Sequence, residues 1–570
     1  MEKNILEVTD LKDMLNKTRK LYGDRPGYKI KIGEGKYKTY THNEIRDMIN
    51  YLGTALISLG LKDKRIAVIG ENRYEWELAY LSIVCGTGIV VPLDRSLPDN
   101  ELEELIERSE VEAIFYSKKY EETIKTIRFS EKNKLKHLIS MDTDVHDEGI
   151  YSEKELIEKG KALVEAGNRE FIDAKINPEE MNIMLFTSGT TSKSKVVALS
   201  HRNLVSNVMD FASVLTIDSS DRILSFLPLH HVFECTVGML YSLYIGAQRS
   251  FCDGIRHIVE NLNEYKITFA SFVPAIYESM YKTIMKNLEK QGKLEAVKKL
   301  MEENRNKTMS EKKEIFKDIH AVFGGDIKLF VSGAAALDAE VEHAFRDLGI
   351  NLCQGYGLTE TSPVIGVETD ENFRVGSIGK SLPHVQARID DANEEGMGEL
   401  TVKGPNVMLG YYQDEEATKE VMEEDGWFHT GDLAKIDEDG YIFICGRKKS
   451  VIVLKNGKNI FPEEMEALVN KIEGVTESFI FGKQQSEDKE DIKINVKIIF
   501  DRDVMKEAYK AETDEEIRKV LSDKIKEINK IMPKYKAIRG IIISEEPLIK
   551  TTTNKIKRQA NLDVINNMVN

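Results

Sequence analysis

The sequence predicts an α/β protein in which a large N-terminal α/β domain of several subdomains precedes a small, mobile α+β domain. Two observations lead to this fold class. The chain has 570 residues, which is more than one hydrophobic core normally supports. Helical patterns, with apolar residues three or four apart, alternate with short β-branched runs at 65–70, 88–93 and 111–116, as expected for layers of helices on a sheet.

The most apolar stretch, residues 78–93, is interrupted by Gly86, Gly88 and Pro92 and is shorter than the roughly 20 residues of a membrane span. It predicts a buried helix followed by a strand. Residues 131–180 are polar and rich in lysine, which favours a connecting segment at the surface. Residues 282–319 are charged but carry apolar residues at helical spacing, which predicts surface helices. A basic membrane-contact helix is less favoured there, because glutamates dilute the charge.

Near the C-terminus, Thr513 and Glu516 form a capping-box pattern ahead of an amphipathic run, which predicts a helix that begins there. Runs of β-branched residues at 477–483, 492–500 and 538–544 predict strands. Together they make a compact α+β unit of about 120 residues. We therefore expect an N-terminal domain at 1–446, a hinge at 447–450 and a C-terminal lid domain at 451–570.

Charge and cysteine content exclude several classes. Lysine and arginine total 80 against 96 aspartates and glutamates, a net charge of -16 that argues against general nucleic-acid binding. The five cysteines form no C-x-x-C pair, so we interpret them as buried small residues rather than zinc or disulfide partners. They are Cys85, Cys235, Cys252, Cys353 and Cys445. The charged N-terminus lacks a secretion signal, which predicts a cytoplasmic protein, with peripheral membrane contact as an alternative.

A loop rich in hydroxyls and glycine, FTSGTTSKSKVVALS, occupies residues 186–200. Gly189 lets the backbone turn and Lys195 supplies positive charge, a combination that suits phosphate. The hydrogen-bond donors of the loop are Thr187, Ser188, Thr190 and Thr191. Its flanks look like strands and it lacks the G-K-S/T ending, which argues against a Walker-type ATPase. Alone, such a loop is more often a solvated turn.

Two later segments offer a nucleotide site. In QGYGLTE, at 354–360, glycines flank Tyr356, so that its ring can lie flat against a planar ligand, while Thr359 and Glu360 offer oxygen ligands suited to Mg²⁺. DGWFHTGDL at 425–433 and the GRKKS segment that begins at 446 provide Asp432 and Arg447. An acid and a guanidinium of this kind can hold the two hydroxyls of a ribose.

A last motif, PLIKTTTNKIK at 547–557, places Lys555 on a loop at the far end of the small domain. TSGTT, GYGLTE, WFHTGD, GRKKSVIVLKNG and this late lysine together resemble the adenylate-forming (AMP-binding) superfamily. Acyl-CoA synthetases, firefly luciferase and nonribosomal-peptide adenylation domains share it. The resemblance covers nearly the whole chain. It implies an acid–thiol ligase with Mg²⁺ as cofactor and ATP and CoA as co-substrates.

The resemblance implies roles for the matching positions. The 187–195 loop would bind the β- and γ-phosphates, Thr187 and Glu360 would ligate Mg²⁺, and Lys555 would bridge the carboxylate and the α-phosphate. Lys449 matches the residue about which the small domain turns. Positions implied to bind ATP or AMP are Thr187, Ser188, Gly189, Thr190, Thr191, Lys195, Ser332, Gly333, Ala334, Ala335, Gly355, Tyr356, Gly357, Thr359, Asp432 and Arg447. Positions implied to line a CoA tunnel are Lys455, Asn456 and Gly457.

The chemistry of acid activation fits these roles. A carboxylate that attacks the α-phosphate of ATP brings like charges together, so the step needs Mg²⁺ and a lysine to disperse negative charge. The lysine must then leave, because a thiol has to reach the same carbonyl. We therefore expect the small domain to act as a mobile lid.

The segment LPLHHVFE at 227–234 bears on the acid. It resembles a segment of fatty acyl-CoA synthetases in which His231 gates the acyl pocket, which favours a medium- or long-chain fatty acid and makes His231 a candidate catalytic residue. A structural role for His230 and His231 as satisfied, partly buried histidines is about as well supported. No proton transfer is assigned to either ring.

Two alternatives stay open. Ser192, Ser194 and Val196 stand where Gly, Pro and Gly are common in the family's phosphate loop, which leaves room for an impaired homologue that only binds acyl or nucleotide ligands. An adenylating enzyme that hands the acyl group to an acyl carrier protein, instead of CoA, is equally consistent with the motifs.

Overall fold

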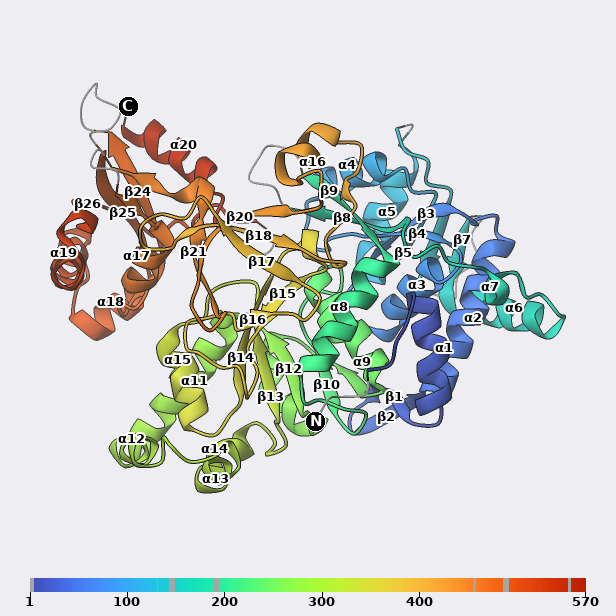
Figure 1. Cartoon of the computed structure of the whole chain (residues 1–570), viewed down its shortest axis with the longest axis horizontal. Coiled ribbons are helices and arrows are strands. Elements are labelled where there is room, and N and C mark those ends of the chain that lie inside the picture. The colour runs from blue at the N-terminus through green and yellow to red at the C-terminus, as the bar shows by residue number, and fades with distance from the viewer. Residues whose placement is uncertain are drawn as a thin grey trace.

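The computed structural model describes residues 5–130, 132–142, 149–187, 194–454, 458–484, 492–551 and 555–569. Two large sheets form the N-terminal part, with helices packed around them (Figure 1). Their central strands are parallel: β10, β12, β13 and β14 in one, and β3, β4, β5 and β6 in the other. These strands are rich in apolar residues and almost wholly buried, because helices cover both faces of a parallel sheet.

The strands of the large sheets are as follows. The first sheet has the order β16 (Lys380–Ser381), β15 (Val364–Val367), β14 (Leu352–Gly357), β13 (Leu329–Ser332), β12 (Phe269–Phe272), β10 (Arg222–Ser225), β11 (Gln248–Phe251), β1 (Pro26–Gly33) and β2 (Lys36–Thr41). The second has the order β19 (Gly410–Tyr411), β9 (Lys195–Ser200), β8 (Met181–Thr187), β4 (Gly88–Pro92), β3 (Lys64–Ile69), β5 (Ala113–Tyr116), β6 (His137–Ser140) and β7 (Ile150–Ser152).

Three smaller sheets complete the strand inventory of the described residues. An antiparallel sheet contains β17 (Gln386–Asp390), β18 (Gly398–Lys403), β20 (Phe428–Ile436) and β21 (Ile442–Arg447). A short pair is β22 (Ile452–Val453) with β23 (Asn459–Ile460), and the C-terminal sheet has β24 (Val475–Gln484), β25 (Ile492–Phe500) and β26 (Gly540–Ser544).

The helices fall in three groups along the chain. Those before β10 are α1 (Leu11–Tyr22), α2 (His42–Ser58), α3 (Tyr74–Val84), α4 (Asp99–Ser109), α5 (Glu121–Arg128), α6 (Glu153–Glu165), α7 (Glu170–Asp173) and α8 (His201–Val214). Those from β10 to β21 are α9 (Tyr241–Ile245), α10 (Ile258–Glu264), α11 (Pro274–Lys290), α12 (Leu294–Glu303), α13 (Met309–Ile315), α14 (Lys317–Val322), α15 (Ala339–Asp347) and α16 (Glu415–Val421). The C-terminal ones are α17 (Pro462–Val469), α18 (Arg502–Tyr509), α19 (Asp514–Ile531) and α20 (Arg558–Val569).

Local sequence explains where several helices begin. The Thr41 and Thr513 hydroxyls accept hydrogen bonds from backbone N–H groups three residues on, and the glutamates at those positions reach back, so α2 and α19 start with capping boxes. Pro274 occupies the first turn of α11, where no N–H is needed. The predicted capping box at Thr513 and Glu516 is therefore confirmed.

The main core lies between the two large sheets. Val68 and Val331, one from each sheet, belong to one buried cluster together with apolar residues of α3, α8 and α9. In α8, the ring of Phe211 meets that of Tyr241 edge-on at 5.1 Å between centroids, a favourable arrangement for aromatic pairs. Separate clusters cover the outer faces of the two sheets. Sheets and helices thus alternate in layers, and the loops at the strand ends are left to form a site.

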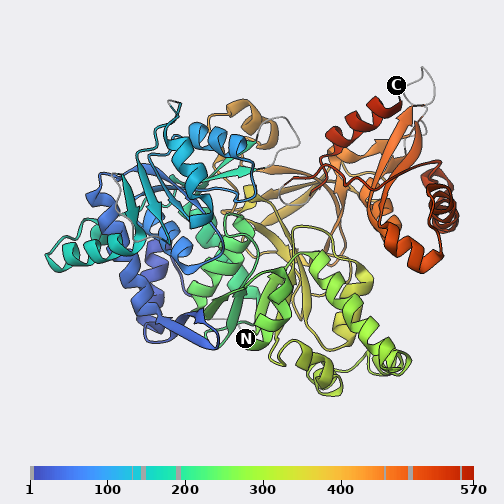
Figure 2. The same ribbon diagram turned by 180° about the vertical axis from the view of Figure 1, so that it is seen from behind.

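The C-terminal unit has its own core. Ile480 and Val496 of β24 and β25 pack with Leu521 and Ile525 of α19 in a buried cluster separate from the others. Figure 1 and the reverse view in Figure 2 both show this unit beside the N-terminal part, next to the sheet that contains β20 and β21. Such a self-contained core is expected of a domain.

Several expectations can now be judged. The predicted fold class is confirmed, and residues 78–93 form α3 and β4. The prediction that residues 131–180 are connective was wrong in part: β6, β7 and α6 lie there, because short apolar runs inside the polar segment add two strands to the second sheet. Cys85, Cys235 and Cys353 are buried, whereas Cys252 and Cys445 are half-buried, contrary to expectation. Among the described residues, no helix is long and apolar enough to cross a membrane.

Candidate active site

The centre of the candidate site is the buried carboxylate of Asp432. Antiparallel pairing of β20 and β21 sets Asp432 opposite Arg447, whose Nε lies 2.9 Å from Asp432 Oδ1. The hydroxyl of Tyr356, at the end of β14, donates to Asp432 Oδ2 at 2.5 Å. Burial raises the pKa of Asp432, against the opposing influence of Arg447 and Tyr356. The predicted ribose pair and the predicted adenine-stacking tyrosine therefore converge on one carboxylate.

Close backbone packing explains the glycines around Tyr356. A Cβ atom at Gly357 would lie 1.8 Å from the carbonyl oxygen of Pro363, whereas one at Gly355 would meet no atom nearer than Val367 Cγ2 at 3.6 Å. Gly357 is thus required by the turn into β15 rather than by a ligand alone. Thr359 lies just beyond, in a short 3-10 turn with Glu360.

The loop after β13 faces this tyrosine strand. Ser332 pairs with Gln354 across the two parallel strands, and the Ser332 hydroxyl is buried without a hydrogen-bond partner among the described residues. Gly333 follows, then Ala334 with a positive φ of 70°, a strained conformation for a residue with a Cβ. Ala334 and Ala335 are exposed, and this backbone is open to a planar ligand.

A second cluster joins the phosphate loop to the candidate metal ligand. Thr187 and Lys195 are register partners at the ends of β8 and β9, so the loop lies between two strands, as the sequence predicted. The Lys195 ammonium lies 4.3 Å from the centre of the Tyr411 ring, and the Tyr411 hydroxyl donates to Glu360 Oε1 at 3.0 Å. Tyr411 therefore connects the cation of the loop to the carboxylate.

The oxygen donors of this cluster suit Mg²⁺. Thr187 offers a hydroxyl and Glu360 a carboxylate that is half-exposed, and Mg²⁺ usually takes one or two protein oxygens together with substrate phosphates and waters. A different group, Asp390, Glu423 and His429, has ligand atoms within 4.8 Å of one another. Arg388 already lies 2.8 Å from the first carboxylate and 2.5 Å from the second, so that group is matched by a protein cation.

Lys555 of the small domain reaches the first cluster. Its pKa is lowered by removal of the ammonium from water and by Arg447, while Asp432 and Glu360 act in the opposite direction. Charge–charge effects of this kind weaken with distance. The lysine predicted from the last motif is therefore within electrostatic range of the Asp432 and Glu360 carboxylates.

Ion pairs anchor the chain on both described sides of Lys555. Before it, Lys550 Nζ lies 2.6 Å from Glu477 Oε1 on β24. After it, Arg558 Nη2 lies 2.7 Å from Glu466 and 3.1 Å from Glu463, both on α17. The segment that carries the lysine is therefore tied to β24 and α17 of the small domain.

The histidines of the LPLHHVFE segment lie close by. Burial lowers the pKa of His231, and Lys555 lowers it further, so the ring is neutral at pH 7 and near the lysine. His230 Nε2 is 3.4 Å from Asp94, and burial lowers its pKa to about 3. The ring is therefore neutral, and the contact is not an ion pair.

Two residues of the same segment were missed as functional candidates. Phe233 lies against Gly333, where a Cβ atom would be 2.9 Å from the phenyl ring. Glu234 begins a π-helix at 234–240 and is fully withdrawn from solvent with Arg249 and Glu77. Arg249 lies 2.6 Å from each carboxylate, and all three side chains are at most 2% exposed.

The charge balance of this triad is uneven, since one guanidinium serves two carboxylates. Burial raises the pKa of Glu234 to about 7 and also raises that of Glu77. A π-helical turn often marks a functional position. The acidic residue of LPLHHVFE thus fixes the start of the helix behind His231 instead of facing the site.

Some predicted residues are not brought into the site. Lys449 is exposed in the short turn at 448–450, and its role in a hinge stays a prediction. Ser188, Gly189, Thr190 and Thr191 of the loop, and Lys455, Asn456 and Gly457 of the CoA tunnel, lie outside the described residues. Val196 lies in β9 and is 7% exposed, so it has the extended backbone that a β-branched residue favours.

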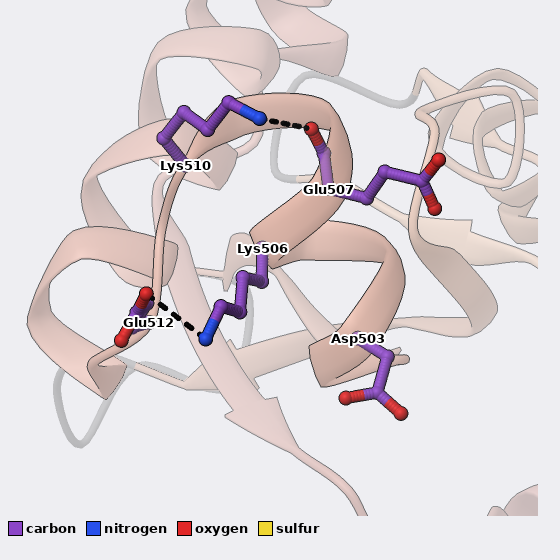
Figure 3. A pocket seen from close by; sticks show the side chains of 5 residues that line it. All are labelled: Asp503, Lys506, Glu507, Lys510 and Glu512. Atoms are coloured by element: carbon purple, nitrogen blue, oxygen red, sulfur yellow. Dashed lines mark hydrogen bonds and ion pairs between the residues drawn. The ribbon is translucent and has the colours of Figure 1, made fainter.

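A separate hollow lies on the small domain. It has a volume of about 320 Å³ and is lined by Asp503, Lys506, Glu507, Lys510 and Glu512 (Figure 3). Lys506 pairs with Glu512 at 3.1 Å, and Lys510 donates to the Glu507 carbonyl at 3.3 Å. No predicted site residue lines this hollow.

A buried acid with a tyrosine and a guanidinium, a glycine-rich strand end and a lysine from a second domain are the parts that the sequence analysis assigned to a nucleotide site. A family model described as AMP-binding enzyme matches residues 17–412, and one described as AMP-binding enzyme C-terminal domain matches residues 449–569. The chain belongs to the AMP-binding enzyme family. The resemblance stated from the motifs is thereby confirmed.

Individual proteins of known name agree with this assignment. The chain is 30% identical over 486 residues to human long-chain-fatty-acid–CoA ligase 1, covering 78% of this chain and 68% of that one. It is 29% identical over 495 residues to mouse long-chain-fatty-acid–CoA ligase 6, covering 81% and 70%. The crystal structure of the anthranilate–CoA ligase AuaEII with anthranoyl-AMP superposes with a TM-score of 0.75 at 20% identity, covering 97% of each chain. The interpretation as an acid–thiol ligase is confirmed at the level of these relatives.

Proposed function

We propose that the protein activates a medium- or long-chain fatty acid with ATP to an acyl-adenylate and then transfers the acyl group to CoA, giving acyl-CoA, AMP and pyrophosphate. The observation that carries the proposal is the convergence of Tyr356 and Arg447 on the buried carboxylate of Asp432, with Lys555 of the small domain within electrostatic range of it. A lysine in that place neutralises charge where a carboxylate and an α-phosphate would meet.

In the first step, a carboxylate oxygen of the acid attacks the α-phosphorus, and the bond from that phosphorus to pyrophosphate breaks. Asp432 and Arg447 hold the ribose, and the ring of Tyr356 supports the base. Glu360 and Thr187 would hold Mg²⁺, which disperses the charge of the leaving pyrophosphate. The ammonium of Lys555 stabilises the negative charge that develops on the transferring groups.

In the second step, the thiol of CoA gives up its proton and its sulfur attacks the acyl carbonyl carbon, and the bond to AMP breaks. Lys555 lies over that carbonyl during the first step, so the small domain has to turn away about residues 447–450. Motions of this kind often set the overall rate of an enzyme.

The choice of acid is supported by the residues that lie near Lys555. His231 is neutral and half-buried, and Phe233 lies against Gly333 at the candidate nucleotide edge. An uncharged, aromatic wall favours an alkyl chain over a second carboxylate, because burial of an unpaired charge is costly. The names of the relatives with about 30% identity point to the same substrate class.

The test uses purified protein with ATP, Mg²⁺, CoA and a panel of acids from acetate to long-chain fatty acids. AMP release should require both acid and CoA and should be greatest with medium or long chains. The Lys555→Ala variant should lose ATP–pyrophosphate exchange by about 10²–10³-fold, as when other preorganised charge stabilisers are removed. Lys557→Ala, an exposed lysine two residues away, is the matched control and should keep full exchange.

Two outcomes would redirect the proposal. Acid-dependent pyrophosphate exchange without acyl-CoA, but with acylation of a holo-carrier protein offered beside CoA, would assign the carrier as acceptor. Absence of exchange with every acid would leave an impaired homologue that binds ligands only. The regular strand at Val196 favours the active enzyme over the impaired one.

A further inference from the structure

Two buried carboxyl groups lie behind the candidate nucleotide edge. Glu342 is on α15, and Glu368 follows β15; both are 0% exposed. The proposed function uses neither residue. Buried carboxylates without a cation are costly, so their presence calls for a physical explanation.

The hydrogen bonds of Glu368 tie several segments together. Glu368 Oε2 accepts from the backbone N–H of Gln354 at 2.9 Å, and Oε1 accepts from that of Arg374 at 3.2 Å. The Ser377 hydroxyl lies 3.4 Å from Oε1. Glu342 Oε2 accepts from the backbone N–H of Gly376 at 3.2 Å. The pair thus joins α15 to β14 and to the 374–377 loop.

One oxygen of this pair lacks a donor. Glu342 Oε1 is buried, and no N–H or O–H group of the described residues reaches it. Gly376 and Ser377, adjacent in the loop, donate to Glu342 and Glu368 respectively, which brings the two carboxyls together. Burial, and after it the Glu342 carboxyl, raises the pKa of Glu368 to about 10. A proton held between the two carboxyls would satisfy the oxygen and remove the repulsion of like charges.

The arginines near this pair of carboxyls have other partners. The Arg374 guanidinium pairs with Asp437 and Asp439, so only its backbone faces Glu368. On α15, the Arg346 guanidinium lies 3.6 Å from the centre of the Phe373 ring and 3.9 Å from Asp370. The Cys353 thiol is a further titratable neighbour, and burial raises its pKa.

Gln354 connects Glu368 to the two loops of the candidate nucleotide edge. Its side-chain oxygen accepts from the backbone N–H of Leu337 at 2.8 Å, and its amide donates to the Ser377 carbonyl at 3.2 Å. Leu337 ends the loop that starts at Ser332, and Gln354 immediately precedes Gly355 and Tyr356. One buried side chain, 4% exposed, therefore sets the spacing of the two loops.

We propose that Glu342 and Glu368 share one proton and that this acid–carboxylate pair holds Gln354, so that Glu368 and Gln354 are positioning residues of the nucleotide edge. The inference rests on the proposed function only in treating that edge as the ATP site. A Glu368 carboxyl that stays protonated when folded contributes stability fully below the usual pKa near 4.5, and loses that contribution as the pH rises through about 10.

The first measurement is thermal unfolding between pH 8 and 10.5. Glu342→Gln places an amide where the shared proton lies: its oxygen can accept from Gly376 and its nitrogen can donate to an ionised Glu368. The melting temperature of the wild type should fall with pH more steeply than that of Glu342→Gln. Glu371→Gln, an exposed acid in the same loop, should follow the wild type. Identical slopes for the wild type and Glu342→Gln would overturn the shared proton.

The second measurement is binding of ATP with Mg²⁺, without acid or CoA, over the same pH range. The dissociation constant of the wild type should rise at least about threefold more than that of Glu342→Gln, as expected when a titration on the protein is coupled to binding. Equal rises would overturn the positioning role even if unfolding supports the proton. No ATP binding at pH 8 would remove the proposed function and this role with it, while the unfolding profile would still decide the shared proton.

Discussion

Replacing Arg249 by methionine should destabilise the N-terminal domain far more than loss of an exposed arginine. Arg249 is 0% exposed and lies 2.6 Å from both Glu77 and Glu234. Methionine fills a similar volume but leaves two buried carboxylates without a cation. Removal of one partner from a buried ion pair costs about 3–5 kcal/mol. For a domain of about 450 residues, that corresponds to a melting temperature roughly 3–5 °C lower.

The deficit should depend on pH in a defined direction. Burial already raises the pKa of Glu234 to about 7 with the guanidinium present, and without it both carboxyls should bind protons at still higher pH. Arg249→Met should therefore be most destabilised near pH 8 and recover part of its stability near pH 5.5, where protonation neutralises the acids.

The assay is thermal unfolding of both proteins at the two pH values, with Arg202→Met as the matched control. Arg202 is 55% exposed and pairs with a similarly exposed Glu179, so its loss should cost at most about 1 kcal/mol. The reasoning fails if Arg249→Met melts within error of Arg202→Met, or if its deficit is the same at pH 5.5 and pH 8.

Three further outcomes are expected. Lys471 of the small domain lies 2.7 Å from Asp338 at the start of α15, so Lys471→Glu should slow ATP–pyrophosphate exchange by about 2–5-fold, as expected for loss of a partly exposed ion pair. The double variant Lys471→Asp with Asp338→Lys should restore the exchange rate. Thioester formation from a preformed adenylate should not fall in parallel with exchange. Gly333→Ala should raise the KM for the acid more than that for ATP, because the added methyl would press on Phe233. Treatment with EDTA should abolish exchange, and Mg²⁺ should restore it.

Much of the fold could be predicted because its signals are local. A few adjacent residues are enough to predict each of three features: the alternation of buried strands with helices, the capping box at Thr513 and the strands of the small domain. The strands at 137–140 and 150–152 were missed because they are short, four and three residues long, and are stabilised by pairing with β5 and with each other, which no local pattern reveals.

The candidate site was predictable where motif residues meet one another. Asp432 and Arg447 lie opposite on adjacent strands, and the hairpin around the phosphate loop could be inferred from its apolar flanks. Tyr411 was missed because its role depends on β19 pairing with β9 from a distance of more than 200 residues in the chain. The GYY sequence at 410–412 was its only signal, and a tyrosine in such a run is ordinarily a packing residue.

The anchoring of the lysine segment has a mechanical consequence. Lys550 and Arg558 fix the two sides of this segment to β24 and α17, so Lys555 moves together with the small domain. A rotation of the small domain about residues 447–450 would take the ammonium away from the acyl carbonyl and open the path for the thiol in a single movement. The order of the two half-reactions would then be kept by geometry, without a separate signal to report that the first is complete.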